Sequence, residues 1–239
     1  MSSKSAKAVV VKRKKRRSGG GFISEAYAKE YDAQQRLGGS FCAFLKVKGE
    51  VRFFIVANNK PETANFKNFF SIAIGASNSE LGEAKDILNE LRSEWNDIFS
   101  SQDFHPTVGL YFLSRYLKGI MEGFWFPKAL AVEYMIFDPV SNVLHTVRLN
   151  GDYESHAVGE VENTSIVVGA YNVRLRRELQ KGLQRCLDRS DISDKALQNL
   201  GLKLSKKYGL TTFTLRHSQV VRVPSSGTQT DDTSPVEID

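Results

Sequence analysis

The sequence predicts an α+β protein: one globular domain with a mixed or antiparallel sheet or sheets and about four main helices. Three observations lead to this prediction. Strand-like runs and helical periodicities follow one another in blocks, without the strict alternation of a doubly wound parallel sheet. A hydrophobic fraction of 41% with fifteen Phe supplies a sizeable core. Charge gathers in two flanking segments, so we expect a disordered basic arm (1–21), a domain (22–223) and a disordered acidic tail (224–239).

The two flanking segments have opposite charge. Residues 1–21 hold eight Lys or Arg and no acid, and residues 224–239 hold four acids and no base. Taking these from the net charge of +6 leaves +2 for the predicted domain. Six of the cations are consecutive: Lys12, Arg13, Lys14, Lys15, Arg16 and Arg17. Like charges in a run repel one another and do not pack, so the arm is expected to be solvated and to bind a polyanion or a receptor.

The first half of the predicted domain is mostly strands. Residues 22–37 leave one apolar side and predict a short helix, which Gly38 and Gly39 would end. Three strands should follow, at 41–48, 51–57 and 69–74. The first two are apolar on both faces near their middles, which predicts inner strands covered on both sides. They flank Gly49-Glu50, where we expect a two-residue hairpin turn.

The second half alternates between helix pairs and strands. Apolar residues recur at spacings of three and four in the clearest helix, 79–100. The expected helices are 79–100, 107–122, 171–188 and 193–208. The expected strands are 128–137, 143–150, 165–170 and 211–223. The stretch from Asp152 to His156 gathers an acid, a hydroxyl and an imidazole, but neighbouring residues seldom converge on one substrate, so it is predicted to be a polar loop.

The helix expected at 171–188 carries four aligned cations. Arg174, Arg177, Lys181 and Arg185 recur at spacings of three, four and four, so they share one face, opposite a stripe of leucines. Such a ridge could follow a line of phosphates, and it could equally be an ordinary solvated helix face. If the last two helices pack side by side, the next one would extend the ridge with Lys203, Lys206 and Lys207.

Arm and ridge together predict a non-enzymatic protein that binds RNA or DNA through phosphates, with low sequence specificity. Each cation that neutralises a phosphate releases a condensed counterion. The Lys12–Arg17 run also has the composition of a nuclear-import signal, so an import receptor is a second expected partner. A basic arm on a compact body resembles the layout of viral coat or nucleocapsid proteins and of small nuclear nucleic-acid-binding proteins, and a coat protein would self-assemble. A nuclear adaptor that uses the arm only for import is an alternative.

Enzyme and cofactor motifs are not found in the sequence. It has no phosphate-binding Gly-x-x-x-x-Gly-Lys loop, no Gly-x-Gly-x-x-Gly and no Gly-x-Ser-x-Gly. Its four His and two Cys have neither metal-ligand spacing nor a disulfide framework. We therefore expect no cofactor, no metal and no disulfide. No apolar stretch reaches about 18 residues and no secretory signal is recognisable, which predicts a nuclear, cytoplasmic or virion protein without membrane contact.

One enzyme hypothesis rests on the order of elements between residues 40 and 223. Paired strands, two helices, paired strands, two helices and a last strand resemble the order in proteasome-type N-terminal-nucleophile hydrolases. The resemblance implies an active or degenerate hydrolase that cleaves itself after Gly38-Gly39, with Ser40 as nucleophile and Lys67 as a candidate for the lysine that tunes it. The chain departs from that pattern at Asn58 and Asn59, where those proteases carry an acid.

Overall fold

The computed structural model describes residues 24–65, 69–98, 106–123 and 128–216, which form an α+β fold with two antiparallel sheets. This confirms the predicted fold class. The described residues contain five helices: α1 Glu25–Leu37, α2 Asn78–Ile98, α3 Pro106–Glu122, α4 Val173–Asp188 and α5 Asp194–Tyr208. One sheet has the strand order β8-β1-β2-β9, formed by β1 Phe41–Val47, β2 Glu50–Ala57, β8 Thr164–Gly169 and β9 Thr211–Arg216. The other has the order β3-β4-β5-β6-β7, formed by β3 Glu62–Asn65, β4 Phe70–Gly75, β5 Val132–Asp138, β6 Val143–Val147 and β7 Tyr153–Ala157.

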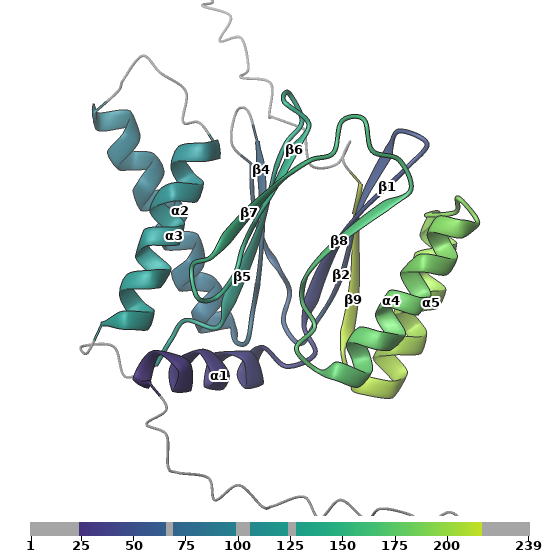
Figure 1. Ribbon diagram of the computed structural model, residues 1–239, viewed down its shortest axis with the longest axis horizontal. Helices are drawn as coiled ribbons and strands as arrows, with labels where there is room; N and C mark the ends of the chain where they lie inside the picture. Colours follow the sequence, from purple (N-terminus) through teal and green to yellow (C-terminus); the bar gives the residue numbers. More distant parts are fainter. Residues whose placement is uncertain (1–23, 66–68, 99–105, 124–127, 217–239) are drawn as a thin grey trace, which may run out of the picture.

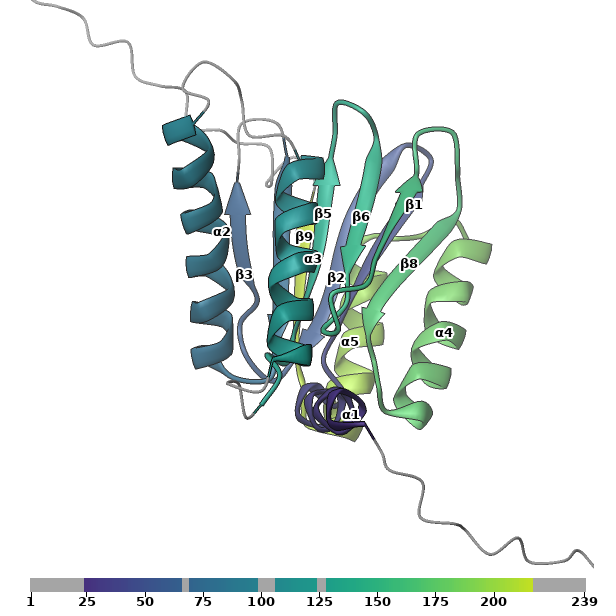
Figure 2. The same cartoon turned by 60° about the vertical axis from the view of Figure 1, so that its left-hand side comes forward.

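The molecule is a sandwich of four layers (Figure 1). The two sheets face each other, α2 and α3 cover the outer face of the β3–β7 sheet, and α4 and α5 cover the outer face of the β8–β9 sheet. The turned view separates the two helix pairs in the same way (Figure 2). The observed order of elements agrees with the predicted order of strands, helices, strands, helices and a last strand.

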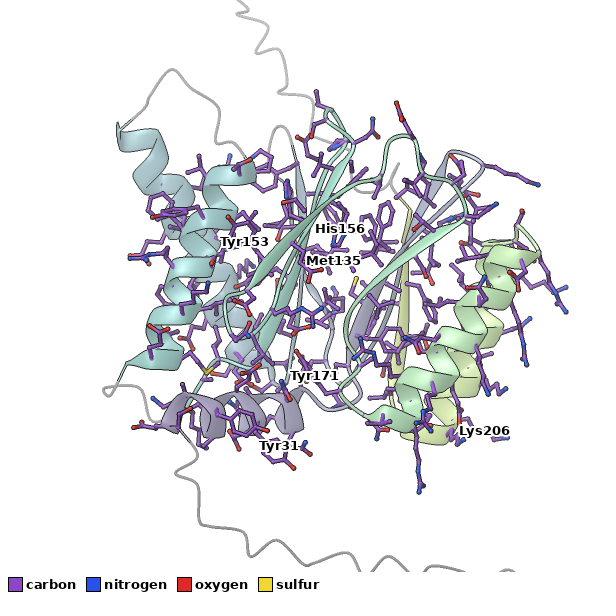
Figure 3. All side chains as sticks on the ribbon, in the orientation of Figure 1. Tyr31, Met135, Tyr153, His156, Tyr171 and Lys206 are labelled. Atoms are coloured by element: carbon purple, nitrogen blue, oxygen red, sulfur yellow. The ribbon has the colours of Figure 1, made fainter. Side chains whose placement is uncertain are left out.

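Three apolar layers hold the sandwich together, and the strand sequences explain them. In β1, Phe41, Ala43 and Leu45 pack under α4 and α5, whereas Cys42 and Phe44 point into the space between the sheets. This follows from the period of two along a strand. Aromatic rings fill the middle layer, where Phe44 lies 5.6 Å from both Phe53 and Phe137 between ring centroids. Met135 belongs to this layer and lies at the centre of the molecule (Figure 3). Strands buried on both faces therefore read as continuous apolar runs.

Helix α1 closes one end of the sandwich and ends at Gly38, whose backbone has a positive φ of 56°. Tyr171, which lies just above α1 in Figure 3, donates a hydrogen bond from its hydroxyl to the carboxylate of Glu133 in β5. Glu133 is buried, and burial raises the pKa of its carboxyl even though the Tyr171 bond opposes the rise. Among the described residues its Oε2 has no hydrogen-bond partner. The segment entering α4 is thus tied to the opposite sheet through a buried acid.

Two details differ from the sequence predictions. The β1–β2 turn consists of Lys48 and Gly49, both with positive φ (52° and 75°), because Val47 pairs with Glu50. The predicted turn at Gly49-Glu50 was therefore wrong by one residue. The segment from Tyr153 to Ala157 is strand β7 and not a loop, since it pairs along the whole of β6. Strand β7 is an exposed edge strand, so its sequence is polar and lacks the apolar pattern that predicts a strand.

None of the described helices is both long enough and apolar enough to cross a membrane.

Candidate nucleic-acid interface

Helix α4 presents the predicted row of cations, and its own sequence sets its orientation. The side chain of Asn172 caps the helix by accepting hydrogen bonds from the backbone N–H groups of Arg174 and Leu175, each at 3.1 Å. A stripe of four leucines is buried against the sheet: Leu175, Leu179, Leu183 and Leu187. Burying that stripe turns the opposite face to solvent.

The four predicted cations are all exposed on that outer face: Arg174, Arg177, Lys181 and Arg185. From first to last they span about 16 Å at 1.5 Å per residue. Within the described part of the chain, none of them makes a side-chain hydrogen bond or a salt bridge. A cation held by an acid must lose that partner before it binds a phosphate. These four have no such partner to lose.

Helix α5 packs antiparallel beside α4 and adds lysines. The close approach occurs at Gly182, where a Cβ atom would lie 2.4 Å from Leu200 Cδ1. Of the three predicted lysines, Lys203 and Lys206 are exposed, and Lys206 lies on the outer side of this helical layer (Figure 3). Lys207 instead donates a hydrogen bond to Glu178 of α4. The two helices therefore form one basic surface, and Lys207 links them through its hydrogen bond to Glu178.

The Lys207–Glu178 contact shifts the pKa values of both side chains. The hydrogen bond from Lys207 lowers the pKa of the Glu178 carboxyl, and the same bond raises the pKa of the Lys207 ammonium. Both groups are therefore charged at neutral pH. Glu178 lies between Arg177 and Lys181 in the sequence of α4, and its carboxylate pairs with Lys207 of α5.

A groove of about 560 Å³ lies between α4 and α5. It adds two cations that the sequence analysis did not single out, Arg189 after the end of α4 and Lys195 in the first turn of α5. The short connection from α4 to α5 brings both beside Arg185. The signal was present in the sequence, because a short loop between two helices places them antiparallel and side by side. We call the exposed cations of α4 and the cations of this groove the basic face.

The basic arm and its six consecutive cations, Lys12 to Arg17, lie outside the described residues. The body meets the arm at Ser24, which caps α1 by accepting a hydrogen bond from the N–H of Tyr27. Helix α1 begins beneath α3, on the side of the molecule away from α4 (Figure 1).

Of the residues of the hydrolase hypothesis, Ser40 is described and Lys67 is not. Ser40 precedes β1 and is fully buried. Its hydroxyl accepts a hydrogen bond from the N–H of Asn58 at 3.3 Å, its one partner among the described residues. No described side chain forms a hydrogen bond with Ser40 as a base would. The backbone of Ser40 is tied on both sides, since its N–H donates to Leu37 and its carbonyl accepts from Ala170.

The histidines that the structure describes have structural surroundings. His145 Nδ1 lies 2.8 Å from the hydroxyl of Ser155 on the paired strand, and His156 Nε2 lies 3.6 Å from Glu154. Among the described residues, no three His, Cys, Asp or Glu side chains are grouped so that they could hold a metal ion.

Neither a protein-family model nor a curated protein sequence matches this chain.

Proposed function

We propose that the protein binds RNA or DNA through its phosphates, with the basic arm as the capture element and the basic face of α4 and α5 as the docking surface. The observation that supports this most is the row of four exposed cations on α4 without acid partners in the described residues. Phosphate contacts of this kind fix position on a nucleic acid and carry no sequence information, so low sequence specificity is expected.

Two parts of the chain would contribute to phosphate binding. The arm holds eight cations, which on a single strand correspond to a salt slope of about five if most of them contact phosphates. The α4 row holds four, which correspond to a slope of about three. The arm therefore supplies the larger electrostatic share. The row, fixed on a rigid helix, gives the complex a defined orientation.

The experiment is a fluorescence anisotropy titration of a labelled 20-nucleotide RNA and a 20-base-pair DNA across a salt series. Full-length protein is compared with a deletion of residues 1–21. We expect a large loss of affinity, a flattening of the log K against log salt slope by about five on the single strand, and residual binding by the basic face. If neither protein binds either probe, the proposal is wrong.

A second candidate function is favoured by a different surface. Helix α3 exposes Tyr111, Phe112 and Tyr116 at 54%, 43% and 40% of their surface. Exposed aromatic side chains are enriched where proteins contact one another. We propose as the alternative an adaptor that binds a protein through α3 and uses Lys12–Arg17 for nuclear import. Loss of nuclear accumulation on deletion of 1–21, without nucleic-acid affinity in either form, would favour it.

A third candidate stays open through the element order, which agrees with the one that the hydrolase hypothesis implies. Its test is the mass of the purified protein, because a chain that began at Ser40 would have lost the arm and α1. An intact chain in active protein would exclude self-cleavage at that site.

A further inference from the structure

The groove between α4 and α5 is lined by more positive than negative side chains. Its described lining includes five cations, Lys181, Arg185, Arg189, Lys195 and Lys203. It includes two acids, Glu178 and Asp191, and both have other partners. Glu178 accepts a hydrogen bond from Lys207, and Asp191 accepts one from the N–H of Ser193 at 3.0 Å. Most of the groove's positive charge is thus left for an occupant that carries several negative charges.

Strand β9, which precedes the acidic segment, ends near the start of helix α5, whose following residues line this groove. Strand β9 ends at Arg216, which pairs in register with Arg52 of β2. The guanidinium of Arg52 in turn donates a hydrogen bond of 2.9 Å to Asp194, the first residue of α5. The last described residue therefore lies at the end of the molecule where α5 begins, and Lys195 is the next residue along that helix.

The acidic residues that follow are within reach of the groove. Asp231 is fifteen residues beyond Arg216, so the two residues can be as far apart as roughly 50 Å. The part of α5 that lines the groove, from Lys195 to Leu204, is about 14 Å long at 1.5 Å per residue. The segment 224–239 can therefore lie along the groove without being fully extended.

The basic arm is the other candidate partner for these acids, but it joins the body at the end of the sandwich opposite Arg216. The arm joins the body at α1, which closes the end of the sandwich where β9 begins, since Thr211 pairs with Ala57. Arg216 lies at the opposite end of the same strand. Helices α4 and α5, which line the groove, lie beside strand β9, and the acidic segment follows the end of that strand (Figures 1 and 2).

We propose that residues 224–239 bind in the α4–α5 groove through their four carboxylates, Asp231, Asp232, Glu237 and Asp239, and occupy it in the free protein. A short tether supplies an effective concentration of about millimolar, so contacts that are individually weak are sufficient. The contact is electrostatic and weakens with salt. A consequence, which rests on the proposed function, is that RNA or DNA has to displace the segment before it binds the groove.

The direct test is zero-length carbodiimide cross-linking of the dilute full chain without nucleic acid, read by mass spectrometry of the monomer. We expect intramolecular links from the four acids to Lys181, Lys195 or Lys203. A variant with Arg185→Gln and Arg189→Gln keeps all groove lysines but weakens the groove, and we expect at least a threefold lower yield. The matched control, Arg174→Gln with Arg177→Gln, removes two cations from the same helix outside the groove and should leave the yield unchanged. Links to arm lysines alone, or equal yields from both variants, would overturn the proposal.

Cys186 provides an independent readout because it lines the groove, whereas Cys42 is buried and serves as the internal control. Alkylation of Cys186 by neutral iodoacetamide should be at least threefold faster when the four acids are replaced by Asn or Gln. An unchanged rate would contradict the proposal.

Neither readout uses nucleic acid, so they separate this inference from the proposed function. Groove links without any RNA binding would support the docking and reject the proposed function. RNA binding with neither groove links nor protection of Cys186 would support the proposed function and reject the docking of the acidic segment.

Discussion

The two helical layers of the sandwich cover their sheets in the same manner but carry opposite charge. Both use a stripe of apolar side chains, such as Leu81, Leu88 and Leu113 on one side and Leu175 and Leu183 on the other. Helices α2 and α3 hold four Lys or Arg against seven Asp or Glu. Helices α4 and α5 hold nine against three.

The difference shows which part of the sequence serves the fold. The buried stripes are what a sheet requires, and the α2–α3 layer demonstrates that a basic outer surface is not needed to cover one. Covering a sheet therefore does not by itself account for the charge of the α4–α5 layer. Four adjacent cations on one helix face also repel one another, which the fold alone would not favour.

The largest expected effect in this comparison comes from removing the charge of the α4 row. Replacing Arg174, Arg177, Lys181 and Arg185 by Gln should weaken RNA binding roughly a hundredfold at 0.15 M salt and flatten the single-strand salt slope by about three. The control variant replaces four exposed cations elsewhere, Lys60, Lys85, Arg115 and Lys128. Anisotropy titrations of both variants measure the difference. Equal losses would mean that net charge and not the basic face determines binding.

The packing of the two layers can be compared by one substitution in each. Gly201→Ala places a Cβ 2.4 Å from Thr212 Cγ2, so α5 must move off β9, and the free energy of unfolding should fall by about 1–3 kcal/mol. A Cβ at Gly119 of α3 meets no atom within 4 Å, and Gly119→Ala should raise stability by about 0.5–1 kcal/mol. Urea unfolding measures both. The same sign for both changes would contradict the described packing.

The buried carboxyl of Glu133 links the segment before α4 to the opposite sheet and should make stability depend on pH. Its pKa is raised in the fold, chiefly by burial, so the native state holds this proton at a pH where the unfolded chain has released it. Its contribution to stability is thus fully present below the ordinary carboxyl pKa and is lost as pH rises through the raised value.

Glu133→Gln should remove the loss of stability with rising pH, because an amide does not titrate. Its oxygen can still accept the hydrogen bond from Tyr171. Thermal unfolding from pH 4 to 7 should show a melting temperature a few degrees above that of the wild type at pH 7, with the gap closing toward pH 4. Glu133→Ala, which leaves Tyr171 without its acceptor, should be destabilised throughout. A constant gap for Glu133→Gln over this range would show that the carboxyl does not titrate as described.

The smallest expected effect concerns the acid within the basic layer. Glu178→Gln removes one negative charge beside the groove and releases Lys207, so RNA affinity should rise about fourfold at 0.15 M salt. Stability should hardly change, because both groups lie at the surface. Glu122→Gln on α3 is the matched control and should leave affinity unaltered. A weaker complex for Glu178→Gln would indicate that the Lys207–Glu178 contact positions the cations.

Much of the fold was predictable because periodicity reports burial. The leucine stripe of α4 and the doubly apolar runs of β1 and β2 specified their elements almost to the residue. Strand β7 could not be predicted from the same signal, since an exposed edge strand buries neither face. The hairpin turn was misplaced by one residue because register is decided by pairing across the hairpin, which a single strand does not reveal.

The α4 row was predictable for the same reason as the helix that carries it: spacings of three and four place residues on one face. The sequence did not determine whether the row is exposed. In the structure the four leucines of α4 are buried, so the opposite face, which carries the row, is exposed. Arg189 and Lys195 were not identified because they join the site only through the antiparallel packing of α4 against α5. A site built from two helices depends on a tertiary contact that neither helical pattern contains.

The most direct test of the account is to map where RNA touches the protein. Full-length protein would be cross-linked by ultraviolet light to an RNA carrying 4-thiouridine, and the linked peptides identified by mass spectrometry. The account predicts that links within the folded body fall in α4, α5 and the turn between them, residues 173–208. Links concentrated in α2 and α3, or confined to residues 1–21, would contradict the assignment of the basic face as the docking surface.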